Sequence, residues 1–199
     1  MSSRSLEDLN QAMKIAICPG HHAAAKGAVS RTYKVNEYDE AAKVIPYLTQ
    51  ELTNKGYEVE VITGLLSKKI KKINAGGFAL AIDLHFNAGG GQGCEVIYCP
   101  NSAERARQAG ILSAQIASVL GTKDRGGKEG WYQSGDNPGT EPDAFVSQTS
   151  CPAFIPEPLF IDNDEEVAKW LVGRQHATIA RAIAKGIVTV IGTLNRSQL

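Results

Sequence analysis

The stretch Ala79–Phe86, with the sequence ALAIDLHF, is the segment that decides the fold class. Its short apolar run is typical of a buried strand. A second run of this kind, Lys14–Cys18 (KIAIC), ends at Pro19-Gly20, where a turn is expected. The same reasoning predicts further strands at Tyr57–Thr63, Cys94–Cys99 and Ala153–Ile161.

Apolar residues at helical spacing lie between these strands. In the first helical segment, 39–55, they recur at intervals of four, three and four, and a glycine follows as a helix stop: Ala41, Ile45, Leu48, Leu52 and Gly56. Further helices are expected at 66–73, 102–120, 164–172 and 175–191. Strands that alternate with helices predict a single α/β domain, with a mostly parallel twisted sheet flanked by helices on both faces.

The domain organisation follows from composition along the chain. Residues 1–12 are a polar N-terminal lead-in, 13–192 form the predicted domain, and 193–199 are expected to be a C-terminal tail. Residues 121–150 hold few aliphatic side chains and are predicted to form a long loop, a feature that is usually functional or disordered. Whether this loop closes over a substrate is left open.

Charge and hydropathy exclude some classes of function. The chain of 199 residues is 43% hydrophobic and has 21 basic and 21 acidic residues, so its formal net charge is zero. A protein that binds nucleic acid through bulk charge would show a basic excess. We recognise no apolar stretch of the roughly 20 residues that a membrane span needs. The N-terminus lacks the pattern of a secretory signal, which predicts synthesis in the cytoplasm.

The four cysteines are predicted to be free and mostly buried thiols. Cys94 and Cys99 lie an odd number of residues apart on one expected strand, so their side chains should point to opposite faces. Cys18 and Cys151 lie at strand ends, and thiolates bind zinc well. A structural zinc site with cysteine ligands therefore remains a minor alternative.

Three of the four histidines fall where predicted strands end. They are His21, His22 and His85, and the fourth is His176. In α/β sheets the active site gathers at such ends. Two imidazoles and one carboxylate would make a zinc site with an open position, and a second carboxylate could serve as general base and then general acid. The simpler interpretation is that these are ordinary loop histidines, with His22 exposed and His176 on the surface of a helix.

Taken in order, these pieces resemble the zinc-dependent N-acetylmuramoyl-L-alanine amidases of bacterial autolysins and phage endolysins. The resemblance runs from Lys14 to about Gly192. It rests on these motifs: Ile17-Cys18-Pro19-Gly20-His21, Leu84-His85-Phe86-Asn87-Ala88, Gly93-Cys94-Glu95, and Pro152-Ala153 with Glu157, Phe160 and Asn163. The chain departs from the family at Cys18, where aspartate is usual, at Asp83, where serine is common, and at Leu159, where glycine is common.

The resemblance implies one Zn²⁺ per chain, bound by His21, Glu37 and His85. It implies that Glu157 polarises the attacking water and later protonates the leaving amine. The bond cut would be the amide that joins the lactyl group of N-acetylmuramic acid to L-alanine in peptidoglycan, which is then the partner. Taken alone, Glu37 would be an ordinary acidic residue at a helix start.

Weaker candidates for substrate contacts are Arg125, Asn87 and Trp131. Arg125 could contact a substrate carboxylate or the oxyanion. Trp131 could stack on sugar or peptide, although packing onto the domain is an equally good interpretation. The sequence also contains a local run of lysines: Lys68, Lys69, Lys71 and Lys72. The first interpretation is the solvent-exposed face of an amphipathic helix. The second is a contact for anionic wall polymer.

Two alternatives to the amidase stay open. The domain could bind muropeptide without cutting it, or it could be a zinc peptidase that cuts within the stem peptide. The missing secretory pattern favours an endolysin that is released to the cell wall at phage lysis. The sequence does not indicate the host, the preferred stem peptide, the oligomeric state or a need for a wall-binding partner.

Overall fold

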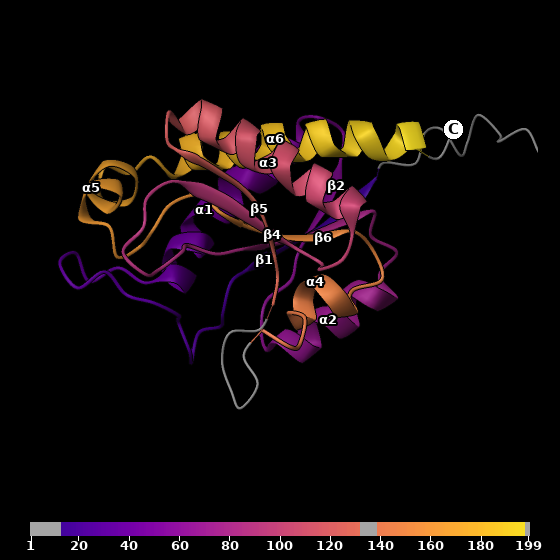
Figure 1. Ribbon diagram of the computed structural model, residues 1–199, viewed down its shortest axis with the longest axis horizontal. Coiled ribbons are helices and arrows are strands. Elements are labelled where there is room, and N and C mark those ends of the chain that lie inside the picture. Colours follow the sequence, from indigo (N-terminus) through magenta and orange to yellow (C-terminus); the bar gives the residue numbers. More distant parts are fainter. Residues whose placement is uncertain (1–12, 132–138, 198–199) are drawn as a thin grey trace, which may run out of the picture.

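The computed structural model describes residues 13–131 and 139–197, so the expected polar lead-in 1–12 lies outside the described residues. Its centre is a six-stranded sheet (Figure 1). The strands are β1 Lys14–Pro19, β2 Glu58–Val61, β3 Leu80–Leu84, β4 Cys94–Tyr98, β5 Asp124–Glu129 and β6 Ala153–Glu157.

The strand order is β2-β1-β3-β6-β4-β5. Neighbouring strands run parallel except β4 and β6, which are antiparallel, so the prediction of a mostly parallel sheet is confirmed. Because β1, β3 and β6 are parallel and adjacent, their carboxyl ends meet at one edge. The antiparallel pairing places Glu95 of β4 directly opposite Glu157 of β6 at that edge.

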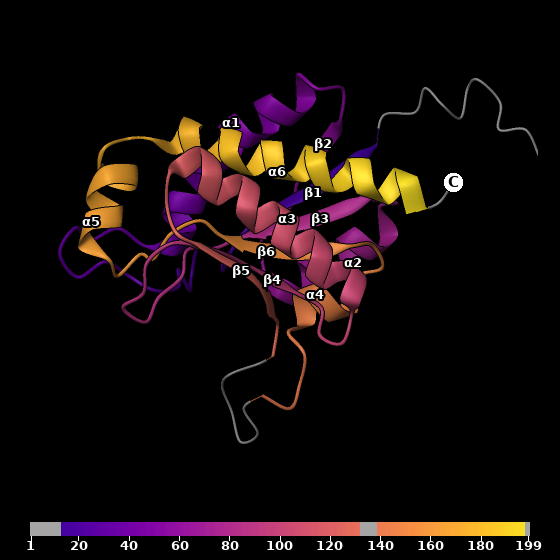
Figure 2. The same cartoon turned by 45° about the horizontal axis from the view of Figure 1, so that its top comes forward.

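Helices cover both faces of the sheet, as expected (Figures 1 and 2). One face carries α1 Glu37–Thr53, α3 Ala103–Leu120 and α6 His176–Ser197, and the other carries α2 Leu66–Ala75 and α4 Ala144–Gln148. Each face buries its own apolar cluster, the larger one under α1, α3 and α6. A short helix, α5 Asp164–Glu166, continues as the π-helical segment η1 Val167–Val172 at one end of the molecule.

The prediction of one long loop over 121–150 is wrong, because this segment contains β5 and α4. The sequence of β5, DRGGKE, lacks aliphatic residues, and β5 lies at the edge of the sheet, where a strand need not be apolar. The five residues of α4 are too few to show a helical period. Asp143 caps α4 by accepting from the N–H groups of Phe145 and Val146.

Several boundaries also differ from expectation. Strand β6 ends at Glu157 rather than at residue 161. The next residue, Pro158, has no backbone N–H, so it cannot continue the hydrogen-bond ladder. Helix α6 extends to Ser197, through most of the expected tail. Residues His176–Leu194 are long and apolar enough to cross a membrane by length and composition alone, a stretch that the sequence reading overlooked. Half of that stretch is buried against the rest of the protein, as in the core helix of a globular domain.

Two polar residues that were expected at the surface are buried. His176 is only 9% exposed, and its Nε2 lies 2.7 Å from Oε2 of the buried Glu40, which ties α6 to α1. Lys69 is 1% exposed, whereas Lys68, Lys71 and Lys72 do lie at the surface. The interpretation of the lysine run as a wet helix face is therefore wrong for Lys69, because this residue faces the sheet.

Candidate active site

His21 follows the end of β1 in a backbone conformation with φ +62°. The preceding Gly20 N–H donates to the carbonyl of Leu84, 2.7 Å away, and this bond joins the ends of β1 and β3. A Cβ on Gly20 would lie 2.5 Å from the ring of His85. Glycine at this position therefore lets the two imidazoles approach to 4.8 Å between ring centroids.

Glu37 is the first residue of α1, and the helix fixes its position. Asn36 caps α1, its side chain accepting from the Asp39 N–H at 2.9 Å. Glu37 Oε1 accepts from the N–H of Ala28 at 2.6 Å, and Oε2 accepts from the N–H of Phe86 at 3.3 Å. The carboxylate is thus held between the loop after β1 and the segment after β3.

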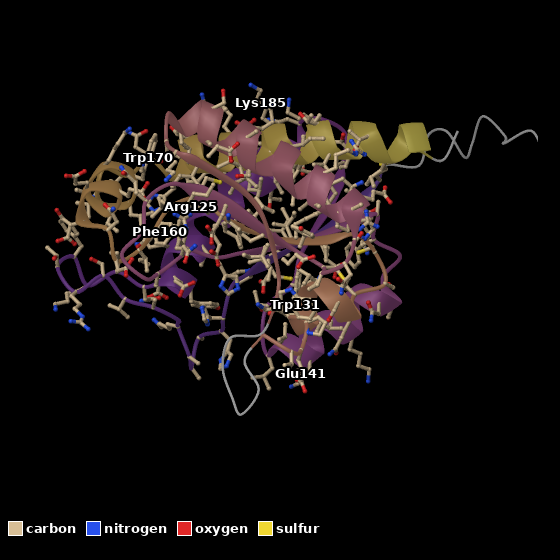
Figure 3. All side chains as sticks on the ribbon, viewed as in Figure 1. Arg125, Trp131, Glu141, Phe160, Trp170 and Lys185 are labelled. Atoms are coloured by element: carbon tan, nitrogen blue, oxygen red, sulfur yellow. The ribbon has the colours of Figure 1, made fainter. Side chains whose placement is uncertain are left out.

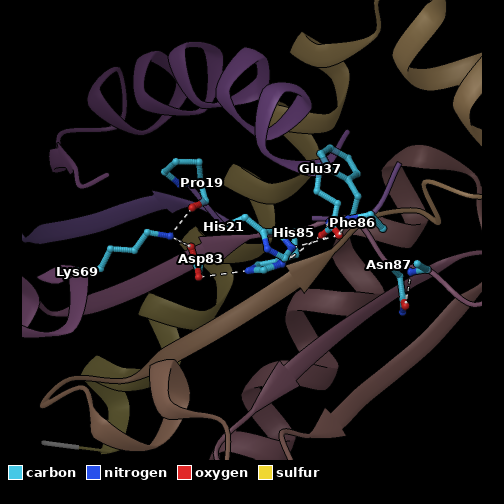
Figure 4. A network of polar contacts seen from close by, with 10 residues as sticks. Pro19, His21, Glu37, Lys69, Asp83, His85, Phe86 and Asn87 are labelled. Carbon is cyan, nitrogen blue, oxygen red and sulfur yellow. Dashed lines mark hydrogen bonds and ion pairs between the residues drawn. The ribbon is translucent and has the colours of Figure 1, made fainter. Parts of the chain in front are cut away.

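The three predicted ligands come together (Figure 4). His21 Nε2 lies 3.2 Å from Glu37 Oε1, and His85 Nδ1 lies 3.3 Å from Glu37 Oε2. Among the described residues, these three form the one group of side chains positioned to hold a metal ion, with donor atoms within 4.8 Å of one another. His22 lines the adjacent cleft but lies outside this group.

The charges at this cluster suit a cation. Burial alone would raise the pKa of Glu37, but hydrogen bonds from His21 and His85 outweigh it and hold the pKa at about 2. Burial likewise lowers the pKa of His85, while Asp83 and Glu37 raise it to about 10. Two imidazole nitrogens and an ionised carboxylate are a donor set that zinc accepts, with release of the histidine proton on binding.

The cysteine alternative does not appear in the described residues. All four cysteines are free, with Cys18 and Cys94 buried and Cys99 and Cys151 partly exposed. Burial raises the pKa of the Cys18 and Cys151 thiols, which disfavours the thiolate that binds zinc. Neither thiol belongs to the group that could hold a metal.

Glu157 ends β6 at the same edge of the sheet. Burial raises its pKa to about 7; the negative charges of Glu95 and Glu37 add to the shift, while His85 and Arg125 oppose it. A carboxyl group that titrates near neutrality can both accept and donate a proton at physiological pH. Glu157 lines a cleft of about 590 Å³ together with His21 and His85.

One of the three weaker candidates lines the cleft with Glu157, and the other two bond Glu95. Trp131 lines the cleft, and its indole N–H donates to Glu129 at 3.0 Å. Asn87 and Arg125 both donate to Glu95, each at 2.6 Å, and do not line the cleft. The Arg125 guanidinium also stacks on Phe160, 4.9 Å from the ring centroid, and Figure 3 shows this pair well away from Trp131.

Sequence reasoning missed three features of this edge. The buried Lys69 and Asp83 lie beside His85, and Asp143 lines the cleft. Glu95 belonged to a quoted motif, yet no pattern indicated that it would pair with Arg125. The Lys69–Asp83 and Glu95–Arg125 contacts join residues from different elements, so sequence spacing carries no signal for them.

Comparison with known proteins identifies the family of this chain and similar proteins of known name. The sequence profile of the N-acetylmuramoyl-L-alanine amidase family matches residues 15–189. The chain is 27% identical over 183 residues to the N-acetylmuramoyl-L-alanine amidase CwlM of Bacillus licheniformis, covering 88% of this chain and 67% of that protein. It is 29% identical over 192 residues to the endolysin of Bacillus phage SPP1, covering 89% of this chain and 66% of that protein. The chain thus spans about two thirds of the length of these curated relatives.

Solved structures share the fold. The catalytic domain of the CD27L endolysin targeting Clostridia difficile superposes with a TM-score of 0.72 at 28% identity, covering 89% of this chain and 97% of that one. An N-acetylmuramoyl-L-alanine amidase from Clostridium difficile 630 superposes with a TM-score of 0.77 at 21% identity, covering 91% and 97%.

Proposed function

Because the chain belongs to the N-acetylmuramoyl-L-alanine amidase family, whose members are amide hydrolases, we propose that it is a zinc-dependent enzyme of peptidoglycan. The bond cut is the amide between the lactyl group of N-acetylmuramic acid and L-alanine. The observation that carries the proposal is the convergence of His21, Glu37 and His85 beside Glu157, at the edge where β1, β3 and β6 end.

The three donors supply the metal site. Two nitrogens and one carboxylate oxygen would hold the zinc ion and leave it open to water or substrate, as a catalytic zinc site requires. Zinc bound there would polarise the substrate carbonyl and lower the pKa of an attacking water. The backbone N–H groups of Ala28 and Phe86 hold Glu37, so the carboxylate needs little reorganisation to bind the ion.

Glu157 performs the proton transfers. Amides are poor electrophiles with poor leaving groups, so the reaction needs a base for the attacking water and an acid for the departing nitrogen. A carboxyl group raised towards neutrality serves both steps in turn. Pro156 and Pro158 flank Glu157 and restrict the backbone of this residue, which lines the cleft.

Substrate contacts are assigned to Trp131 in the cleft and to Arg125 beside Glu95. Trp131 offers an aromatic face within the cleft for the sugar or the peptide. Arg125 offers the guanidinium nitrogens that do not bond Glu95, for a carboxylate of the stem peptide. Asn87 donates to the other oxygen of Glu95, so it helps to fix the carboxylate that Arg125 contacts.

The setting of the reaction is the bacterial cell wall. The similarity to the SPP1 endolysin supports a lytic role, with synthesis in the cytoplasm and action on the wall after release at phage lysis. Peptidoglycan is then the partner, and the zero net charge agrees with recognition through the cleft rather than by bulk attraction.

Mass spectrometry of purified peptidoglycan after incubation with the zinc-loaded protein tests the function. We expect free stem peptides that begin with L-alanine, together with intact glycan strands. Cleavage inside the stem peptide would replace the amidase with a zinc peptidase. Zinc binding without products from any wall type would leave a muropeptide-binding module.

A further inference from the structure

Helix α2 carries one lysine that is withdrawn from water. The side chain of Lys69 is 2% exposed, and its ammonium donates to the carbonyl of Pro19 and to Asp83 Oδ1, the latter at 3.1 Å. A buried ammonium is costly unless it is paired and hydrogen-bonded. The proposed mechanism does not use Lys69, so its burial needs an explanation.

The two carboxylate oxygens of Asp83, the partner of Lys69, contact different side chains. Asp83 Oδ1 bonds Lys69, and Oδ2 lies 3.3 Å from Nε2 of His85. The other ring nitrogen of His85, Nδ1, lies 3.3 Å from Glu37. The imidazole is therefore held between Asp83 and Glu37 (Figure 4), with Nδ1 turned towards Glu37.

The same lysine reaches both strands that bear histidines. Pro19 ends β1 two residues before His21, and Asp83 lies in β3 two residues before His85. In the sheet, Pro19 is paired with Leu84, next to Asp83. Lys69 thus connects the carboxyl ends of β1 and β3 from the helix layer that contributes no metal ligand.

We propose that Asp83, the buried ion-pair partner of Lys69, is a positioning residue for the metal centre. Asp83 accepts the Nε2–H of His85, and this bond fixes the ring so that Nδ1 is presented to the ion. Carboxylate partners of histidine ligands act in this way in other metal sites, and their loss typically weakens metal binding about 10–100-fold. The inference rests on the proposed zinc site, because it assigns a role towards the same ion.

Two double variants separate the positioning role from the ion pair. Lys69→Met/Asp83→Asn and Lys69→Met/Asp83→Leu both remove the buried charges and replace Asp83 by a side chain of similar size. Only the asparagine keeps an oxygen that can accept from His85. Lys71→Met, at an exposed position of α2, is the control for a lysine lost from this helix.

The readouts are the zinc dissociation constant from competition with a chelator and the visible spectrum of the cobalt-substituted protein. We expect the asparagine variant and Lys71→Met to bind zinc within a few-fold of the wild type. The leucine variant is expected to bind about 10–100-fold more weakly and to give an altered cobalt spectrum. If the leucine variant does not fold, Lys69→Met/Asp83→Ala makes the same comparison.

Equal zinc affinity and equal spectra in the two double variants would overturn the inference and leave Lys69 and Asp83 as a stabilising ion pair. A wild-type protein that binds no zinc would instead contradict the proposed metal site. The two failures are therefore distinguishable.

Discussion

At Glu157 two influences on one carboxyl group act against each other. Burial and the neighbouring carboxylates of Glu95 and Glu37 raise its pKa, while His85 and Arg125 lower it, and the balance lies at about 7. The antiparallel pairing of β4 with β6 sets this balance, because it places Glu95 opposite Glu157. The antiparallel pairing of β4 and β6 thus contributes one of the charges around the proposed acid–base residue.

Replacing Glu157 with glutamine tests that assignment. Glu157→Gln keeps the shape of the side chain but removes the ability to accept a proton from water. We expect turnover of peptidoglycan to fall by about 10²–10⁴-fold, the usual contribution of general acid–base catalysis. Metal analysis should show zinc content equal to that of the wild type. Turnover near the wild-type level would contradict the role of Glu157.

The pH dependence of the reaction should follow the charges around Glu157. Arg125 stabilises the ionised carboxylate, so Arg125→Met raises the pKa of Glu157 further. The base must be deprotonated, so the acid limb of the kcat/KM profile should move up by about 0.5–1 pH unit. Glu95→Gln removes a like charge and should move the limb down. If the acid limb moved in the same direction in Arg125→Met and in Glu95→Gln, the result would contradict this electrostatic account.

The three residues of the proposed metal site could be predicted from sequence because the chain carries motifs that resemble those of the amidase family. His21 and His85 follow apolar strands, and Glu37 came from the motif order rather than from any local signal. The groups that hold these donors could not be predicted. Lys69 looks like a surface residue of a polar helix, and only its packing against the strand ends reveals its contact with Asp83.

At the scale of elements, the start of α1 connects folding to the proposed metal site. Asn36 caps the helix, and Glu37 is its first residue. Asn36→Ala should lower the free energy of unfolding by about 1 kcal/mol and also weaken zinc binding, because the first turn holds the ligand. Urea unfolding of the metal-free protein and a zinc titration measure the two effects.

Ser102→Ala provides the matched control for this prediction. Ser102 caps α3 through the N–H of Arg105, in a helix that carries no donor. We expect a loss of stability of similar size and unchanged zinc affinity. Equal weakening of zinc binding by both variants would mean that the cap of α1 acts only through global stability.

The structure gives a physical reason why the sequence pattern does not indicate β5. β5 is an edge strand with glycines at its centre, and Gly126 has φ +76°, a conformation that other residues seldom adopt. At Gly127, β5 packs closely on α3, where an added Cβ would lie 3.0 Å from Ala109. Such a strand is defined by backbone pairing and close packing, and neither leaves an apolar period in the sequence.

Over the whole molecule, strand order brings distant residues to one edge. The site joins the end of β1, the start of α1 and the ends of β3 and β6, segments separated by more than a hundred residues along the chain. Buried polar pairs between elements hold this arrangement; Glu40 with His176, for example, ties α1 to α6. The alternation of strands and helices predicted the sheet, but the reversal of strand direction between β6 and β4 could be seen only in the structure.

Because the donors come from three separate segments, zinc should stabilise the whole domain. An ion that binds only the folded chain adds about 2.7 kcal/mol at a free concentration of 100 times its dissociation constant. For a domain of this size that raises the Tm by about 5–10 °C, since each kcal/mol shifts it by about 2–4 °C. Differential scanning calorimetry with zinc and with a chelator measures the shift. His85→Ala, which removes one donor, should abolish most of it, and an equal shift in that variant would place the zinc elsewhere on the protein.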